Sequence, residues 1–85
     1  MRITVKLFAI LKDRAGTAET TLDLPPGSTI ATAAGLMAEK FPSISDLLSR
    51  SAFALNRQYA TADHPLADGD ELAILPAVSG GSQSP

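Results

Sequence analysis

The chain has 85 residues, 45% of them hydrophobic and 19% charged, which is typical of one small globular domain. A net charge of −2 does not favour nucleic-acid binding, which usually needs a basic face. The lack of cysteine excludes disulfides and thiolate chemistry, and it fits a reducing compartment. Without a membrane span of roughly 18 apolar residues or a recognisable signal peptide, we expect a cytoplasmic protein that does not bind membranes.

The first part of the chain predicts a β-hairpin. Residues 2–8 alternate apolar and polar side chains, which predicts a strand, and Phe8 breaks the alternation by placing an aromatic ring on the polar side. A short helical turn over 9–15, ending at Gly16, leads to a second strand over 18–24. The short connection indicates that the two strands pair in antiparallel fashion.

A main helix is predicted over residues 30–40. Either Ser28 or Thr29 supplies the N-cap, because both hydroxyls can accept a bond from a free backbone N–H. Pro42 cannot continue the helix, and Gly35 inside it marks either close packing on the sheet or no constraint at all. The apolar residues at helical spacing are Ile30, Ala33, Ala34, Met37 and Phe41.

The second half of the chain predicts short elements that complete a sheet. They are a helical turn over 43–50 with Ile44, Leu47 and Leu48 inward, a strand over 53–56, a return strand at 59–60, turns over 63–66 and 68–70, and a last strand over 71–76. A right-handed crossover would place the first and last strands side by side and parallel. This predicts an α+β, β-grasp (ubiquitin-like) fold, with a mixed sheet of four to five strands and one main helix on one face.

Few residues point to catalysis or metal binding. His64 is the only histidine, and its place before a proline is typical of a turn residue. Asp63, Asp68, Asp70 and Glu71 lack the alternation of a calcium-binding loop, and no other cluster has metal-ligand spacing. We therefore expect no bound metal or cofactor, and no catalytic side chain.

The remaining candidate is the diglycine Gly80-Gly81. A C-terminal glycine carboxylate is ionised at neutral pH, so it can attack the α-phosphate of ATP and become activated for a sulfur or amine nucleophile. Two glycines suit a segment that enters another protein's active site, since they carry no side chains. Taken alone, Ser-Gly-Gly-Ser also matches a flexible linker. We expect a globular domain over 1–78 and a flexible tail over 79–85.

Two segments resemble the MoaD/ThiS family of ubiquitin-like sulfur carriers, and MoaD more than ThiS. They are Asp63–Gly81, which contains Asp-Gly-Asp-Glu, a strand and the diglycine, and Val5–Gly16. The resemblance implies that a MoeB-like enzyme uses ATP to adenylate the Gly81 carboxylate, which becomes a thiocarboxylate. With Gly80 beside it, the tail would enter a MoaE-like large subunit and give sulfur to cyclic pyranopterin monophosphate in molybdenum cofactor biosynthesis.

The resemblance also implies a partner-binding surface at Phe8, Tyr59 and Leu75. The alternative is that these three side chains cover a second small core. After Arg57 the chain carries several acidic residues and neither lysine nor arginine. These acids predict either an acidic flank beside the tail that speeds docking, or polar turns in water.

The chain departs from the family where Ser82-Gln83-Ser84-Pro85 follow Gly81. Gly81 then has an amide in place of a carboxylate. We expect a peptidase to trim these residues; the alternatives are that carrier function is lost or that the four residues are an artefact. Other functions left open are a carrier for thiamine synthesis or tRNA thiolation, and a non-carrier β-grasp module that binds proteins.

Overall fold

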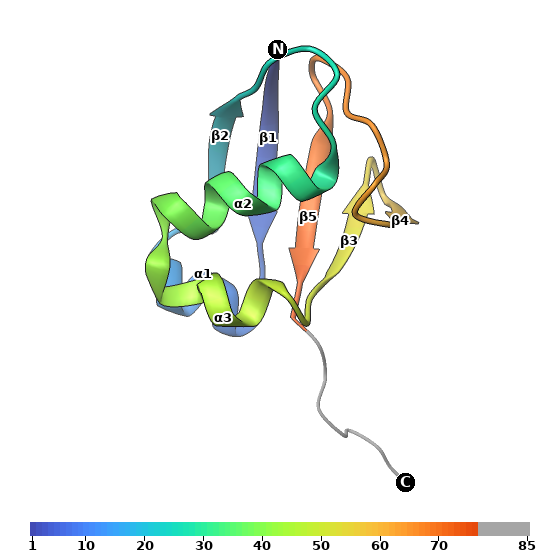
Figure 1. Cartoon of the computed structure of the whole chain (residues 1–85). Helices are drawn as coiled ribbons and strands as arrows, with labels where there is room; N and C mark the ends of the chain where they lie inside the picture. The colour runs from blue at the N-terminus through green and yellow to red at the C-terminus, as the bar shows by residue number, and fades with distance from the viewer. Residues whose placement is uncertain (77–85) are drawn as a thin grey trace, which may run out of the picture.

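The protein is built on a mixed five-stranded sheet, in a computed structural model that describes residues 1–76. The strand order is β2-β1-β5-β3-β4, and the first and last strands, β1 and β5, lie parallel at its centre (Figure 1). The other neighbouring strands are antiparallel. This confirms the predicted β-grasp fold. The strands are β1 (Arg2–Leu7), β2 (Glu19–Asp23), β3 (Ala52–Leu55), β4 (Gln58–Ala60) and β5 (Glu71–Leu75).

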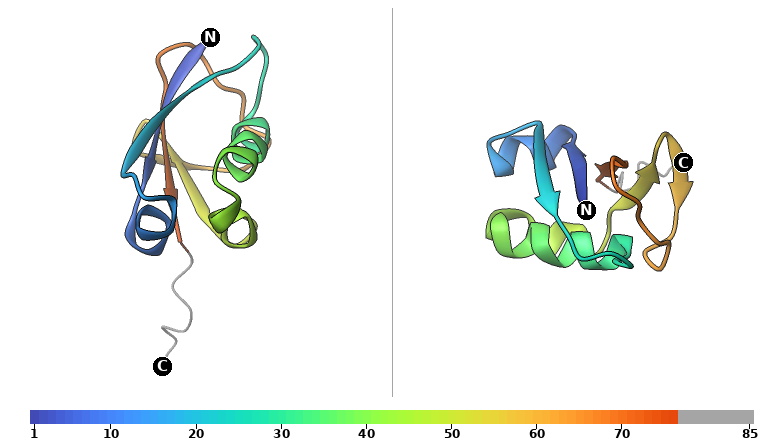
Figure 2. Two further views of the ribbon diagram at one scale, coloured as in Figure 1. Left: turned by 90° about the vertical axis from the view of Figure 1, so that its left-hand side faces the viewer. Right: turned by 90° about the horizontal axis from the view of Figure 1, so that it is seen from above.

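Helix α2 (Ile30–Lys40) crosses one face of the sheet, as predicted (Figure 1). Three shorter elements, α1 (Ala9–Ala15), the 3₁₀ turn η1 (Pro42–Ile44) and α3 (Ser45–Leu48), lie at the end of the molecule where β5 finishes (Figure 2). The Ser43 hydroxyl donates a hydrogen bond of 3.0 Å to the Arg14 carbonyl, which fastens η1 to α1.

The start of α2 is fixed by a capping box. Of the two predicted N-caps, Thr29 takes the role: its hydroxyl accepts from the Thr32 N–H, and the Thr32 hydroxyl accepts from the Thr29 N–H, each at 3.4 Å. Ser28 is buried and donates its hydroxyl hydrogen to the Pro25 carbonyl at 2.8 Å. The helix therefore begins at Ile30, one residue after its cap.

The core lies between α2 and one face of the sheet. Side chains from the inner faces of β1 and β5 pack against the apolar stripe of α2, as the spacing in each segment predicts. Because side chains alternate along a strand, the remaining residues of β1 and β5 stand on the opposite face, called the open face below. The central buried residues are Ile3, Val5, Leu7, Ile30, Ala33, Met37, Leu72 and Ile74.

The predicted strands differ from the observed ones by a residue or two at their ends. The first strand stops at Leu7 because Phe8 becomes the N-cap residue of α1. The last stops at Leu75 because Pro76 has no N–H for the ladder. The strand predicted over 18–24 is 19–23.

Other boundaries differ where the chain turns. The strand predicted over 53–56 runs from 52 to 55, because Asn56 takes up a left-handed φ of 49°. The return strand already begins at Gln58. The single helical turn predicted over 43–50 is two pieces, η1 and α3, and Leu47 is only half-buried.

Gly35 does not mark close packing on the sheet. It is exposed, and a Cβ placed on it would meet no atom within 4 Å. The predicted domain boundary after residue 78 lies outside the described residues. Within residues 1–76, none of the helices combines the length and apolar character that a membrane crossing requires.

Candidate functional site

Strand β5 is the last element of the sheet before the diglycine in the sequence. It is paired with β1 up to Ile74 and with β3 up to Leu75. Gly80 and Gly81 themselves lie outside the described residues. An extended chain from Pro76 to Gly81 would reach on the order of 17 Å. The central strand thus gives the tail a rigid base.

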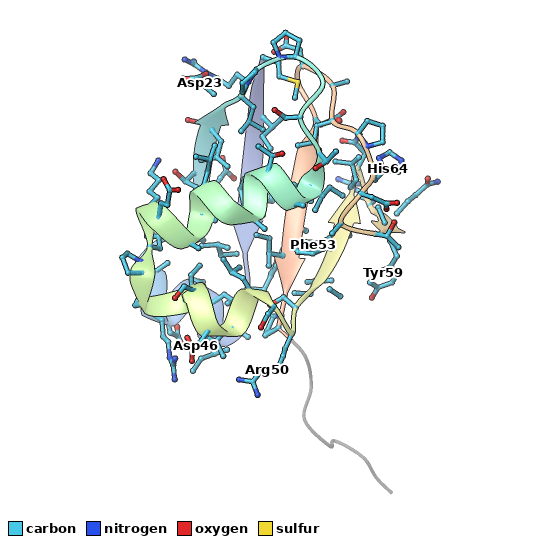
Figure 3. The ribbon with its side chains drawn as sticks, in the orientation of Figure 1. Asp23, Asp46, Arg50, Phe53, Tyr59 and His64 are labelled. Atoms are coloured by element: carbon cyan, nitrogen blue, oxygen red, sulfur yellow. The ribbon has the colours of Figure 1, made fainter. Side chains whose placement is uncertain are left out.

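The three residues predicted to bind a partner share the open face. Leu7 is paired with Ile74, so the next residues, Phe8 and Leu75, come side by side. Phe8 is 43% exposed, and its extended backbone continues the alternation of β1. Tyr59 lies on β4 and is 80% exposed (Figure 3), while Leu75 is half-buried. The exposed ring of Tyr59 in particular favours a surface over a second small core, and the role of the three residues in binding stays a prediction.

Of the two interpretations of the acidic residues after Arg57, the structure favours polar turns over an acidic flank at the base of the tail. Asp68 and Asp70 precede β5, whereas the tail follows it. Since β5 is extended over Glu71–Leu75, the acidic turn lies about 13 Å or more from the start of the tail. The acidic residues were expected near the diglycine because they are close to it along the chain. In space, an extended strand keeps the residues at its two ends apart.

The acidic turn has structural hydrogen bonds instead. The Arg2 N–H donates to the Asp68 carboxylate at 2.7 Å, and the Ala67 N–H donates to Asp70 Oδ2 at 2.7 Å. Gly69 takes a φ of 87° between them, which favours glycine, and its N–H donates to the Arg2 carbonyl at 2.8 Å. These bonds fasten the turn to β1.

Asn56 completes this arrangement from the β3–β4 turn. Its Nδ2 donates to Asp70 Oδ1, and its Oδ1 accepts from the Glu71 N–H, both at 3.0 Å. The backbone N–H of Asn56 also donates to the Glu71 carbonyl at 2.8 Å. Sequence analysis placed Asn56 only at the end of the strand predicted over 53–56. Asparagine is favoured at turn positions with a left-handed backbone conformation, and this preference is the sequence signal that could have identified Asn56.

The surface around the end of β5 carries charges of both signs. Arg14 of α1 and Asp46 of α3 form an ion pair of 3.8 Å at this end. Arg50, just after α3, projects near the point where β5 ends (Figure 3). The end of the domain where β5 finishes therefore carries basic as well as acidic side chains.

Two exposed carboxyl groups have shifted pKa values. A hydrogen bond from Arg2, together with its charge, lowers the pKa of Asp23, and the same pair raises the pKa of Arg2. A hydrogen bond from the Thr61 hydroxyl lowers the pKa of Asp63. All three groups are exposed, so they stabilise local structure and do not create a reactive acid.

His64 is part of a turn. Its Nδ1 lies 2.8 Å from the Pro65 carbonyl oxygen, and its side chain is exposed. In residues 1–76, no three His, Cys, Asp or Glu side chains are grouped so that they could hold a metal ion. The feature of the described part best suited to recognition is the open face beside β5.

Comparisons with known proteins agree with this geometry. The model of the ThiS family matches residues 5–81. The molybdopterin synthase sulfur carrier subunit of Arabidopsis thaliana is 38% identical over 81 residues, which is 95% of this chain and 84% of the relative.

Two solved structures have the same fold. The SAMP1 structure from Haloferax volcanii has a TM-score of 0.85 at 28% identity, over 95% of this chain and all of that one. A second is the complex of subunits 1 and 2 of the molybdopterin-converting factor from Helicobacter pylori, with a TM-score of 0.69 at 24% identity, over 95% of this chain and 100% of the matched one. Since the family model covers the sheet, the helix and the diglycine, the chain belongs to the ThiS family of ubiquitin-like proteins.

Proposed function

We propose that the chain is the sulfur-carrier subunit of a molybdopterin synthase. The observation that carries this proposal is the match to a relative of that name, 38% identical over 95% of the chain, together with a family match that ends at Gly81. The carrier supplies a substrate group, and its partners supply catalysis. The lack of cysteine supports the cytoplasm as the compartment.

The chemistry takes place at the Gly81 carboxylate. An oxygen of this group attacks the α-phosphate of ATP on a MoeB-like adenylating enzyme, pyrophosphate leaves, and an acyl-adenylate forms. A hydrosulfide equivalent then attacks the acyl carbon and expels AMP, leaving a thiocarboxylate. Gly80 gives the tail the narrow cross-section that a tunnel in the partner requires.

The proposed partner that receives the tail with its Gly81 thiocarboxylate is a MoaE-like large subunit. There each carrier delivers one sulfur atom to cyclic pyranopterin monophosphate. The Helicobacter pylori structure is a complex of subunit 1 with subunit 2 of the molybdopterin-converting factor, which supports a partner of this kind. Phe8, Tyr59 and Leu75 are the proposed contact residues, because exposed apolar side chains that share one face favour a protein interface.

Residues 82–85 must be removed before this chemistry can begin. With Ser82 attached, Gly81 carries an amide and has no free carboxylate. We propose that a peptidase cleaves after Gly81, and the end of the family match at Gly81 supports this position.

Intact-mass analysis of the protein from its own cells tests the proposal. The expected species ends at Gly81, and a fraction of it is heavier by the exchange of one oxygen for one sulfur. A chain that keeps Ser82–Pro85, even with the adenylating enzyme and ATP supplied, would refute the carrier function. Conversion of cyclic pyranopterin monophosphate to molybdopterin by the loaded chain and the large subunit separates this pathway from thiamine synthesis or tRNA thiolation.

A second candidate function is that of a small protein modifier. It is favoured by the likeness to SAMP1, a small archaeal modifier protein, at 28% identity. In that case a lysine amine attacks the activated Gly81 carbon in place of sulfur. Peptide mass spectrometry would then find Gly81 joined through an amide bond to lysine side chains of other proteins.

A further inference from the structure

Strand β2 forms one edge of the sheet (Figure 1), and its hydrogen bonds to β1 show which of its backbone groups face outward. Met1 and Leu24 exchange two bonds of 2.8 Å, one donated by the terminal ammonium group of Met1 and one by the Leu24 N–H. In an antiparallel pair, residues that bond to one another alternate with residues that do not. The residues of β2 whose N–H and C=O therefore point away from β1 are Glu19, Thr21 and Asp23.

Two further bonds confirm this alternation. The Leu7 N–H donates to the Ala18 carbonyl at 2.8 Å, which is the next bonded position expected at the far end of the pair. Thr4 is opposite Thr21 in the register, and its N–H donates away from β2, to the Asp70 carbonyl at 3.0 Å. The outward groups of β2 consequently face an edge that no strand of residues 1–76 covers.

Side chains of the protein guard one part of this edge. The Thr17 hydroxyl accepts from the Glu19 N–H at 3.4 Å and donates to the Glu19 carbonyl at 2.9 Å, so it takes both outward groups of Glu19. Lys40 Nζ reaches over from α2 and donates to the Thr20 hydroxyl at 3.0 Å and the Thr21 carbonyl at 3.5 Å. Such side chains hinder pairing with another chain.

The rest of the edge is open. The Thr21 N–H and both backbone groups of Asp23 have no hydrogen-bond partner among residues 1–76. They lie beside a groove of about 430 Å³ between β2 and α2. Leu22 is buried and Leu36 half-buried, and their side chains give the groove an apolar part. The groove is lined by Thr21, Leu22, Asp23, Leu36, Glu39 and Lys40.

We propose that β2 accepts an extended segment of a partner protein as an additional strand, paired through Thr21 and Asp23. The open N–H and C=O groups supply the main-chain bonds that strand addition requires, and Lys40 gives up the Thr21 carbonyl when the segment binds. This inference goes beyond the proposed function and does not depend on it.

The two faces of the sheet at β2 define the chemistry of the segment. On the inner face, aliphatic side chains at every second position would extend the apolar layer of Leu22 and Leu36. On the open face, the neighbours are charged: Asp23 forms an ion pair of 3.0 Å with Arg2. Uncharged polar side chains suit this face, because they leave the ion pair in place. The segment therefore alternates aliphatic and uncharged polar residues.

This edge is separate from the proposed contacts of the large subunit. Asp23 is opposite Arg2 at the start of β1, whereas Phe8 follows the end of that strand. Tyr59 lies on β4, the strand at the other edge of the sheet. An extended segment on β2 can thus hold the carrier while the open face and the tail are engaged elsewhere.

The test uses the full-length protein labelled with ¹⁵N and the blocked peptide Thr-Val-Thr-Val-Thr-Val. Amide exchange and chemical shifts are followed by NMR as the peptide is added. We expect saturable binding with a Kd below about 1 mM, and exchange of the Thr21 and Asp23 N–H slowed by at least about tenfold. The Leu22 N–H, which already faces β1, should change little. The same peptide with every backbone nitrogen methylated should not bind, because it cannot donate to the edge.

A pair of variants separates the backbone from the side chain at position 21. Thr21→Pro removes the outward N–H without removing a bond to β1, and it should weaken binding by about tenfold or more. Thr21→Ala keeps that N–H, and its Kd should stay within about twofold of the wild-type value. Thermal unfolding shows whether Thr21→Pro is folded, and the methylated peptide tests the same bonds on the wild type if it is not.

Three results would overturn the inference: no slowing of exchange at Thr21 and Asp23, equal binding of the methylated peptide, or a folded Thr21→Pro variant that binds like the wild type. Sedimentation of the wild type alone tests a second copy as the occupant. A dimer that Thr21→Pro dissociates would assign the edge to self-association and would also overturn the inference. None of these results bears on the Gly81 carboxylate, so the proposed function stands or falls separately.

Discussion

Replacing Asn56 tests whether the start of β5 is held by side-chain hydrogen bonds. Asn56→Ala removes the bond to the Glu71 N–H and the bond to Asp70, both 3.0 Å long. Each exposed bond contributes about 1 kcal/mol. Alanine at the left-handed φ of 49° costs about 1 kcal/mol more. We therefore expect Asn56→Ala to lower the free energy of unfolding by roughly 2–3 kcal/mol, measured by urea denaturation followed by circular dichroism.

Two glycine variants separate these contributions. Asn56→Gly loses the same hydrogen bonds but accepts the left-handed backbone, so it should be about 1 kcal/mol more stable than Asn56→Ala. Arg57→Gly is the matched control, because Arg57 has a φ of 72° and its substitution removes no hydrogen bond to β5. It should be neutral or slightly stabilising. If Asn56→Ala lies within about 0.5 kcal/mol of the wild type, the hydrogen bonds at the start of β5 do not hold the strand.

Three further substitutions test the helix, the core and the ion pair between Arg2 and Asp23. Gly35→Ala should stabilise the protein by about 0.5–1 kcal/mol and raise the melting temperature by several degrees, since the added methyl meets no atom within 4 Å; a fall would contradict the open surface there. Met37→Ala should cost about 2–5 kcal/mol in urea denaturation, because Met37 is fully buried, and a loss under 1 kcal/mol would mean that the core refills the space. Asp23→Asn tests the pH dependence of stability. The hydrogen bond and the charge of Arg2 lower the pKa of Asp23 from its ordinary value of 3.8. The stabilisation that the ionised Asp23 carboxylate gives the fold is therefore present above that ordinary value and is lost as the pH falls through the lowered pKa. The difference in stability between wild type and Asp23→Asn should therefore shrink under acid, and a constant difference would rule out a role for ionisation.

The sequence by itself determined the elements that depend on local periodicity. Alternation in the first strand put Ile3, Val5 and Leu7 on the buried face, and the 3.6-residue spacing of the main helix put Ile30, Ala33 and Met37 there. The bounds of α2 were predicted without error, because a cap at Thr29 and a proline at position 42 mark its ends in the sequence. The diglycine was also identified from sequence, through the family resemblance, and it lies outside the described residues.

Only the tertiary structure decided which distant residues come together. The crossover rule predicted the parallel pairing of the first and last strands, and the resemblance grouped Phe8, Tyr59 and Leu75. The register that brings Phe8 beside Leu75 and puts Tyr59 on the same face was found only in the structure. The extended strand β5 separates the acidic turn from the base of the tail, and the pairing of β3 with β5 brings Asn56 to Asp70. No local pattern encodes these relations, because strand order and register are set by contacts between segments far apart in the chain.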